Sequence, residues 1–148
     1  MTDAVRILVV DDSPAIRQVL GGILRAAGCE VQTEEGVRPA LRRLRQFLPD
    51  VILTDFNMPR LNGEVLVRLV RRDQRFADLP IFVVSSEDDT GIQERIQEAG
   101  ADAWFDKPVD VQGLIRTIRA VVEAPRLTPR RASRPASGRA SEAAAAQL

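Results

Sequence analysis

The stretch Ile7–Pro14, ILVVDDSP, combines three signals that together decide the fold. Its four leading apolar residues predict a strand covered on both faces, as strands of a parallel sheet are. Ser13 followed by Pro14 is typical of a helix N-cap with proline at the first helical position. Asp11 and Asp12 lie between the two signals, at the carboxyl end of the strand. The stretch therefore predicts a buried strand that passes through an acidic turn directly into a helix.

The same succession of strand and helix recurs five times along the chain. It predicts an α/β fold, an open, doubly wound, five-stranded parallel sheet with five helices on its two faces. The helix expected around Gly91–Glu98 has the thinnest apolar stripe, so we expect it to be the least firmly packed. Gly28 and Gly100 stand where helices should end in a left-handed residue. The expected strands are Val5–Val10, Cys29–Thr33, Val51–Thr54, Ile81–Val84 and Ala101–Phe105.

Each expected helix carries apolar residues at steps of three and four, which place them on one face. In the first helix these are Ile16, Val19, Leu20, Ile23 and Leu24. We expect that face to pack on the sheet. The remaining helices repeat the pattern with their own apolar residues.

Length and composition bound the organisation of the chain. Its 148 residues fit one domain. We expect a folded domain over residues 1–124 and a tail over residues 125–148, rich in Arg, Ala, Pro and Ser, whose composition predicts disorder. The tail holds five arginines and one glutamate, whereas acids outnumber bases in the rest of the chain. An acidic body with a short basic tail is not typical of a general nucleic-acid binder.

Two residue types limit the chemistry. The chain has no histidine, which excludes Ser-His-Asp catalysis and histidine-ligated metal sites. Cys29 is the single cysteine, so no internal disulfide can form. Its apolar neighbours indicate a small buried residue rather than a reactive thiol. The first apolar run is too short for a signal peptide or a membrane span, so we expect a cytoplasmic protein without membrane contact.

Polar residues follow the inner strands at the edge where open parallel sheets bind their ligands. Asp11 and Asp12 follow the first strand, Asp55 the third, Ser85 the fourth and Lys107 the fifth. Each has an ordinary explanation when taken alone. Acids favour helix N-termini, aspartates form turns, and most lysines are surface charges. Together they predict one polar site, and the lone lysine among twenty arginines supports a purpose for its compact charge.

This set of side chains indicates phosphoryl-transfer chemistry. Three ionised carboxylates repel one another unless a cation lies among them. Mg2+ fits best, since it prefers oxygen ligands and binds one or two carboxylates together with a phosphate. Asp55 could then act as a nucleophile and form an aspartyl phosphate. Lys107 and Ser85 would neutralise and hydrogen-bond the phosphoryl oxygens.

At these residues the chain resembles the receiver domain of bacterial two-component response regulators, of the single-domain, CheY-like chemotaxis type. The resemblance covers about Val5 to Val122. It implies a flavodoxin-like fold with strand order 2-1-3-4-5. The matching segments are Leu8–Ser13 (LVVDDS), Val51–Gly63 (VILTDFNMPRLNG), Val83–Ser86 (VVSS) and Ala103–Pro108 (AWFDKP).

The resemblance implies a role for each residue around the expected metal. It makes Asp55 the phospho-acceptor and Lys107 the lysine that binds the phosphoryl group. Asp12 would bind Mg2+ directly, with Asp11 beside it through water or the metal. Asp55 itself and the backbone carbonyl of Asn57 would complete the protein ligands.

The resemblance also implies a conformational switch. Ser85 matches the switch hydroxyl, and Trp104 matches an aromatic residue that changes rotamer, although a large core aromatic is the ordinary alternative. The bond Lys107–Pro108 is expected to be cis, as the family usually has it. Asn57 and Glu87 match side chains that flank the path of the attacking water, which predicts fast self-dephosphorylation.

These observations predict a stand-alone response regulator. A sensor histidine kinase or a histidine phosphotransfer protein would supply the phosphoryl group, and the surface of the fourth helix, fifth strand and fifth helix would then contact a downstream protein. The chain would catalyse only its own phosphorylation and dephosphorylation, so we expect no enzyme in the usual sense. One alternative is a phosphorelay intermediate that passes the phosphate on. Less favoured are a flavin-binding redox protein and a DNA-binding regulator acting through the basic tail.

Overall fold

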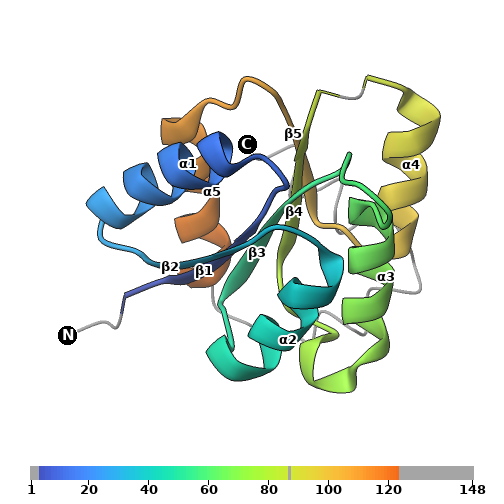
Figure 1. Cartoon of the computed structure of the whole chain (residues 1–148), viewed down its shortest axis with the longest axis horizontal. Helices are drawn as coiled ribbons and strands as arrows, with labels where there is room; N and C mark the ends of the chain where they lie inside the picture. Colours follow the sequence, from blue (N-terminus) through green and yellow to red (C-terminus); the bar gives the residue numbers. More distant parts are fainter. Residues whose placement is uncertain (1–3, 87, 124–148) are drawn as a thin grey trace.

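Strands and helices alternate from the first described strand to the last helix (Figure 1). The computed structural model describes residues 4–86 and 88–123. The elements are β1 (Arg6–Val10), α1 (Pro14–Ala26), β2 (Glu30–Glu34), α2 (Val37–Phe47), β3 (Val51–Asp55), α3 (Gly63–Arg72), a 3-10 turn (Gln74–Phe76), β4 (Ile81–Ser85), α4 (Thr90–Ala99), β5 (Ala103–Asp106) and α5 (Val111–Glu123).

The five strands form one sheet in the order β2-β1-β3-β4-β5, with every neighbouring pair parallel. This confirms the predicted flavodoxin-like architecture. The strand order reverses at β1, which lies between β2 and β3. Val10 pairs with Thr54, so the next residues, Asp11 and Asp55, lie side by side at the carboxyl ends of β1 and β3. The sheet therefore brings two acids together at the point where such folds bind ligands.

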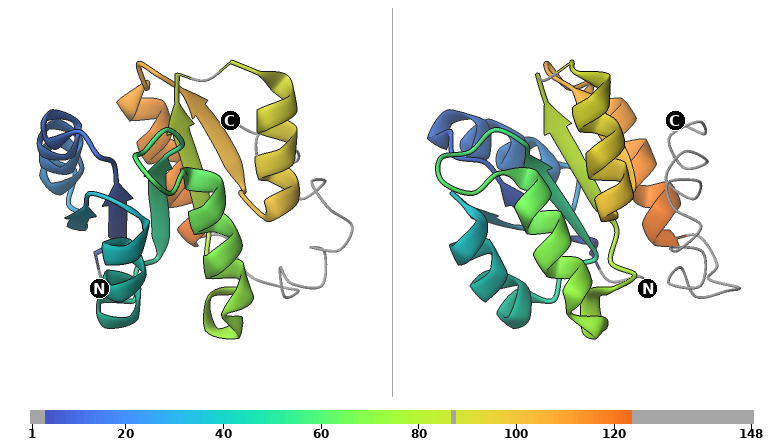
Figure 2. Two further views of the ribbon diagram at one scale, coloured as in Figure 1. Left: turned by 45° about the vertical axis from the view of Figure 1, so that its right-hand side comes forward. Right: turned by 90° about the vertical axis from the view of Figure 1, so that its right-hand side faces the viewer.

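Helices cover both faces of the sheet, as the views of Figure 2 show. Residues of α1 and α5 pack with Ile7, Val9 and Leu53 in one apolar cluster. Residues of α2, α3 and α4 pack with Leu8 and Val10 in the other. Adjacent residues of β1 thus point to opposite clusters, and both are buried, which explains why the strand is apolar without interruption.

Helix ends match the sequence signals closely. The Ser13 hydroxyl accepts a hydrogen bond from the Ile16 N–H at 3.2 Å, and Pro14 is the first residue of α1. Gly28 and Gly100 have positive φ angles of 95° and 122° after α1 and α4. Ile96 is the single buried residue of α4, so its predicted thin packing is confirmed.

Three strands begin later than predicted, β1 by one residue at Arg6, and for β2 and β5 the helix ends give the reason. β2 begins at Glu30 because the N–H of Cys29 donates to the Leu24 carbonyl at the end of α1, at 3.1 Å. β5 begins at Ala103 because the N–H of Ala101 donates to the carbonyl of Ile96 in α4, at 3.2 Å. In both cases the backbone N–H bonds to a carbonyl of the preceding helix. It is then not available for a hydrogen bond to the neighbouring strand.

Other expectations meet the structure only in part. Cys29 is half-buried against the α1–α5 cluster, and burial raises the pKa of its thiol. This agrees with an unreactive residue.

The tail over residues 125–148, with its predicted disorder and the boundary at residue 124, lies outside the described residues. Among residues 4–86 and 88–123, no helix is long and apolar enough to cross a membrane.

Candidate functional site

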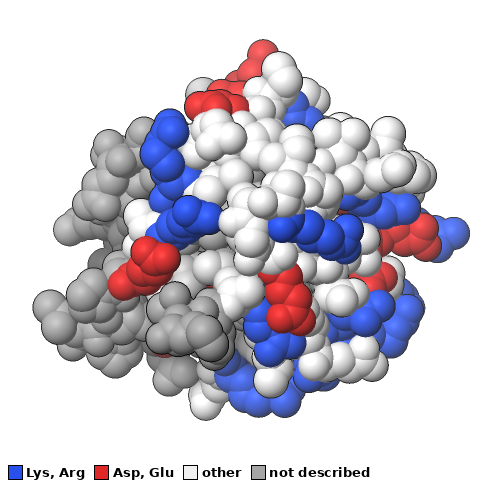
Figure 3. Space-filling model, turned by 90° about the vertical axis from the view of Figure 1, so that its left-hand side faces the viewer, with Lys and Arg blue, Asp and Glu red and all other residues white. Residues whose placement is uncertain are grey.

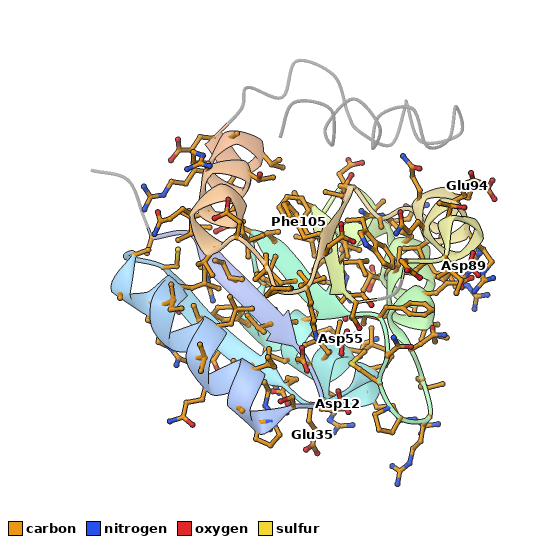
Figure 4. The ribbon with its side chains drawn as sticks, turned by 90° about the horizontal axis from the view of Figure 1, so that it is seen from above. Asp12, Glu35, Asp55, Asp89, Glu94 and Phe105 are labelled. Carbon is orange, nitrogen blue, oxygen red and sulfur yellow. The ribbon has the colours of Figure 1, made fainter. Side chains whose placement is uncertain are left out.

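Three carboxylates meet at the carboxyl edge of the sheet. Asp11 and Asp12 follow β1, and Asp55 is the last residue of β3. Each offers an oxygen, and these oxygens lie within 4.8 Å of one another. Seen from above, the labelled Asp12 and Asp55 lie near each other, whereas Asp89 and Glu94 lie across the molecule (Figure 4). The strand-end prediction for the three acids is therefore confirmed in its geometry.

Lys107 reaches the same point from the end of β5. Its Nζ lies 3.3 Å from Asp11 Oδ2 and 3.4 Å from Asp55 Oδ1, so one ammonium bridges two carboxylates. The backbone N–H of Lys107 donates to the Ser85 carbonyl at 3.0 Å, which anchors the lysine beside β4. The peptide bond to Pro108 is cis, as predicted.

The surroundings of Asp55 do not fully stabilise its ionised form, so its pKa is raised. Burial and the neighbouring Asp11 carboxylate raise the pKa of Asp55, and Lys107 together with the backbone N–H of Asn57 only partly oppose them. Asp11 is held in place because its Oδ1 accepts a hydrogen bond from the Ser13 N–H at 2.9 Å. One lysine thus serves a site that holds three acids.

A hard divalent cation fits this donor set. The ligand atoms are all oxygens, Asp11 and Asp55 are buried, and Asp12 is exposed at the open side. Asn57 is exposed two residues beyond Asp55 and offers its backbone at the same edge. These residues suit Mg2+, which keeps several waters and takes few protein ligands.

The two residues predicted to switch lie on neighbouring strands. Ser85 is fully buried at the end of β4, and Asp106 pairs with it in β5. Trp104 is half-buried, and its ring centroid lies 6.3 Å from that of Phe56. Its indole N–H donates to the Asp106 carboxylate at 3.2 Å. A half-buried ring with one polar contact differs from an ordinary core aromatic, but the switching roles remain predictions. Glu87, predicted to flank the water path, lies outside the described residues.

An apolar hollow adjoins the acidic site, and the sequence analysis missed it. A cavity of about 460 Å³ lies between α1 and the β5–α5 connection, and Asp11, Asp55 and Lys107 form its polar end. Its outer rim includes Ile16, Val19 and Ile23 of α1 together with Pro108 and Val109.

The first helix therefore packs differently from the prediction. Only Leu20 and Leu24 of its five stripe residues are buried, whereas Val19 is 60% exposed and Ile16 and Ile23 are each 37% exposed. The side of the molecule where α1 lies shows a broad uncharged surface between arginines (Figure 3). The signal in the sequence was the small number of polar residues in α1, because a helix with so few cannot bury all its apolar side chains against one face of a sheet.

The family follows from comparison with known proteins. The family model of the response regulator receiver domain matches residues 7–119 of the sequence. This range includes all five strands, apart from Arg6 at the start of β1. The chain belongs to the response regulator receiver domain family. Membership confirms the resemblance drawn from the four motifs, and the receiver domain accounts for most of the chain.

Three similar proteins illustrate the range of the family. The DNA-binding dual master transcriptional regulator RpaA of a Synechocystis strain is 34% identical over 120 residues, covering 79% of this chain and 48% of RpaA. This chain thus spans about half the length of that relative. PilH of Pseudomonas aeruginosa is 35% identical over 117 residues, covering 79% of this chain and 97% of PilH. The chemotaxis response regulator CheY4 of Vibrio cholerae superposes with a TM-score of 0.74 at 33% identity, covering 80% of this receiver chain and 98% of CheY4.

Proposed function

We propose that this receiver is a phosphorylation-activated switch that accepts a phosphoryl group on Asp55 in the presence of Mg2+. The observation that carries the proposal is the position of Asp55, buried between the Asp11 carboxylate and the Lys107 ammonium 3.4 Å away. A carboxylate in this position is a nucleophile whose product, an acyl phosphate, meets a cation as soon as it forms.

The donor we propose is a phosphohistidine on a histidine kinase or a histidine phosphotransfer protein. An Asp55 carboxylate oxygen forms a bond to phosphorus while the phosphorus–nitrogen bond breaks, and the electron pair of that bond stays on the imidazole nitrogen. Lys107 neutralises the transferred oxygens, and the Ser85 hydroxyl turns to donate to one of them. Mg2+, bound by Asp11, Asp12 and Asp55, supplies further charge neutralisation when it is present.

The apolar hollow beside the acids supports a protein as the donor. A small phosphodonor needs only the polar end of the cavity, formed by Asp11, Asp55 and Lys107. The exposed side chains of Ile16, Val19 and Ile23 extend apolar surface away from that end along α1. Exposed apolar surface of this kind, bordered by charges, is typical of a protein interface. We propose that the donor docks there, with its phosphohistidine over Asp55.

For the output we propose protein contact through the surface of α4, β5 and α5. The support is similarity over nearly the full length of a chemotaxis regulator, CheY4. Relay of the phosphoryl group to another histidine protein is the alternative. Incubating the labelled protein with a histidine phosphotransfer protein separates the two, because only a relay intermediate loses its label to the acceptor rapidly.

The proposal is tested by labelling with acetyl phosphate and Mg2+. We expect the intact mass to increase by one phosphoryl group, and we expect no increase for Asp55→Asn or when a chelator removes Mg2+. Glu94→Gln, which removes an exposed acid far from the site, is the matched control and should label normally. Equal labelling of Asp55→Asn would disprove the assignment of the acceptor.

A further inference from the structure

The two ends of α4 are held very differently. Its first residues, Thr90 and Gly91, are exposed, as are Asp88 and Asp89 before them. The Asp89 carboxylate caps the helix by accepting from the Gly91 N–H at 2.8 Å, which is a contact within the first turn. Farther along the chain, Ile92 packs against the α2–α3–α4 cluster, Arg95 pairs with Glu64 of α3 at 2.7 Å, and Ile96 is buried.

The C-terminal end of α4 is fixed by one arginine of α3. The Arg71 side chain, 9% exposed, donates to the Gly100 carbonyl through Nε at 3.1 Å and through Nη2 at 2.8 Å. The same guanidinium donates to the carbonyls of Phe76 at 3.0 Å and Leu79 at 2.6 Å. It also forms an ion pair with Asp102, 1% exposed, at 3.0 Å. Charge-assisted hydrogen bonds in a buried setting are among the strongest that proteins form.

This contact extends into the sheet and requires a glycine. Asp102 Oδ2 also accepts from the Ile81 N–H at 2.9 Å, which ties the end of α4 to the beginning of β4. A Cβ at Gly100 would lie 2.9 Å from Arg71 Cγ and Nε, and the residue also has a positive φ of 122°. Only glycine therefore suits both the helix end and the close approach of the arginine.

We propose that Arg71 makes the C-terminal end of α4 a fixed pivot, so that phosphorylation moves the helix at its N-terminal end. The inference rests on the proposed phosphorylation of Asp55. The N-terminal end follows β4 and Ser85, beside the reacting carboxylate, whereas the Arg71–Asp102 pair lies at the opposite edge of the sheet, where β4 begins. Movement at the site then reaches α4 at its exposed end, away from the buried Arg71 contacts, and becomes a tilt rather than a shift of the whole helix.

Arg71 is in this view a positioning residue for the output surface. An arginine is needed because its planar fork places several N–H groups on carbonyls at once, whereas a lysine ammonium is a single point of charge. Arg71→Lys keeps the charge that faces Asp102 but cannot reproduce the contacts to Gly100, Phe76 and Leu79 together. The neighbouring Arg72 is exposed, so Arg72→Lys is the matched control on the same helix.

Hydrogen exchange of the full chain, with and without Mg2+ and beryllium fluoride as a phosphoryl mimic, tests the pivot. In the wild type we expect exchange of the amides at residues 90–93 to change by about tenfold or more, while those at residues 100–102 change by less than about twofold. In Arg71→Lys the change should extend to residues 100–102, and Arg72→Lys should behave as the wild type.

Equal changes at both ends of α4 in the wild type would overturn the pivot, even if Arg71→Lys failed to fold. An Arg71→Lys protein with the wild-type pattern would also overturn it. Failure of the proposed function looks different, because the protein would then gain no mass from acetyl phosphate. Asp55→Asn, which should show no change with the mimic, establishes that the response comes from the phosphorylation site.

Discussion

At the scale of single residues, Lys107 connects composition to mechanism. It is the one lysine in a chain that otherwise uses arginine, and its ammonium lies 3.3 Å and 3.4 Å from two carboxylates of the site. A guanidinium has a broader, planar shape and places its charge differently. The composition suggested that Lys107 has a specific role, and the structure places its ammonium between the Asp11 and Asp55 carboxylates.

Replacement of Lys107 by arginine should separate charge from shape. We expect Lys107→Arg to keep labelling of Asp55 by acetyl phosphate largely intact, because a cation remains. The conformational response should fall to a fraction of the wild-type value. Trp104 is the only tryptophan, so its fluorescence with the phosphoryl mimic measures the response at a single position. A full fluorescence change in Lys107→Arg would show that the lysine has no special role.

At the scale of elements, a close approach between β3 and α3 positions Asp55, the proposed acceptor. The N–H of Gly63, the first residue of α3, donates to the Phe56 carbonyl at 2.8 Å. A Cβ at Gly63 would lie 2.5 Å from the Asp55 carbonyl oxygen and 3.0 Å from Phe56 Cα. Both neighbours are backbone, so neither can move aside easily. The turn that follows Asp55 is therefore held against α3 at a point where only glycine fits.

Two glycine substitutions should have opposite effects on stability. Gly63→Ala should destabilise the protein by about 1–3 kcal/mol, because the added methyl group displaces backbone. Gly22 lies within α1 with no atom within 4 Å of an added Cβ, so Gly22→Ala should stabilise by about 0.5–1 kcal/mol. Urea unfolding of the two variants measures both effects. The close approach is disproved if Gly63→Ala leaves the free energy of unfolding unchanged or raises it.

At the scale of the whole molecule, the hollow beside α1 and the fixed end of α4 lie on opposite faces of the sheet. The α1 side combines the apolar hollow with access to the acids, and the other side holds α4 at one fixed end. In the proposed function, the donor would dock along α1, and the target would contact α4, β5 and α5, with β5 and α5 adjoining the hollow through Lys107 and Val111. A substitution on the exposed face of α1 should therefore affect the proposed donor contact without touching α4.

A substitution on α1 tests this separation. Val19 is 60% exposed, so Val19→Asp should change stability by less than about 0.5 kcal/mol. Labelling by acetyl phosphate should be unchanged, whereas phosphotransfer from a histidine-phosphorylated donor protein should slow by about tenfold, as expected for a central interface residue. Gln18→Asp, an exposed neighbour outside the apolar stripe, is the control. Unchanged transfer to Val19→Asp would remove α1 from the donor interface.

Much of the fold follows from local patterns in the sequence. Uninterrupted apolar runs such as Ile7–Val10 predict buried parallel strands, and Ser13-Pro14 and the two positive-φ glycines mark helix ends, because these signals depend on backbone chemistry within a few residues. The strand-end rule then predicts which polar residues meet. The starts of β2 and β5 were missed, since helix closure at Cys29 and Ala101 competes with strand pairing for the same N–H groups.

The sequence by itself therefore determined the parallel α/β fold, the meeting of Asp11, Asp12, Asp55 and Lys107, and the thin packing of α4. Tertiary structure alone decided which apolar residues of α1 remain exposed, since burial depends on how far the helix lies over the sheet and not on its periodicity. It also decided that Arg71 holds the end of α4. The contact joins Arg71 to Gly100, 29 positions away, and no local sequence pattern predicts it. Local chemistry repeats at short spacing and can be read along the chain, whereas contacts between distant segments exist only once the chain has packed.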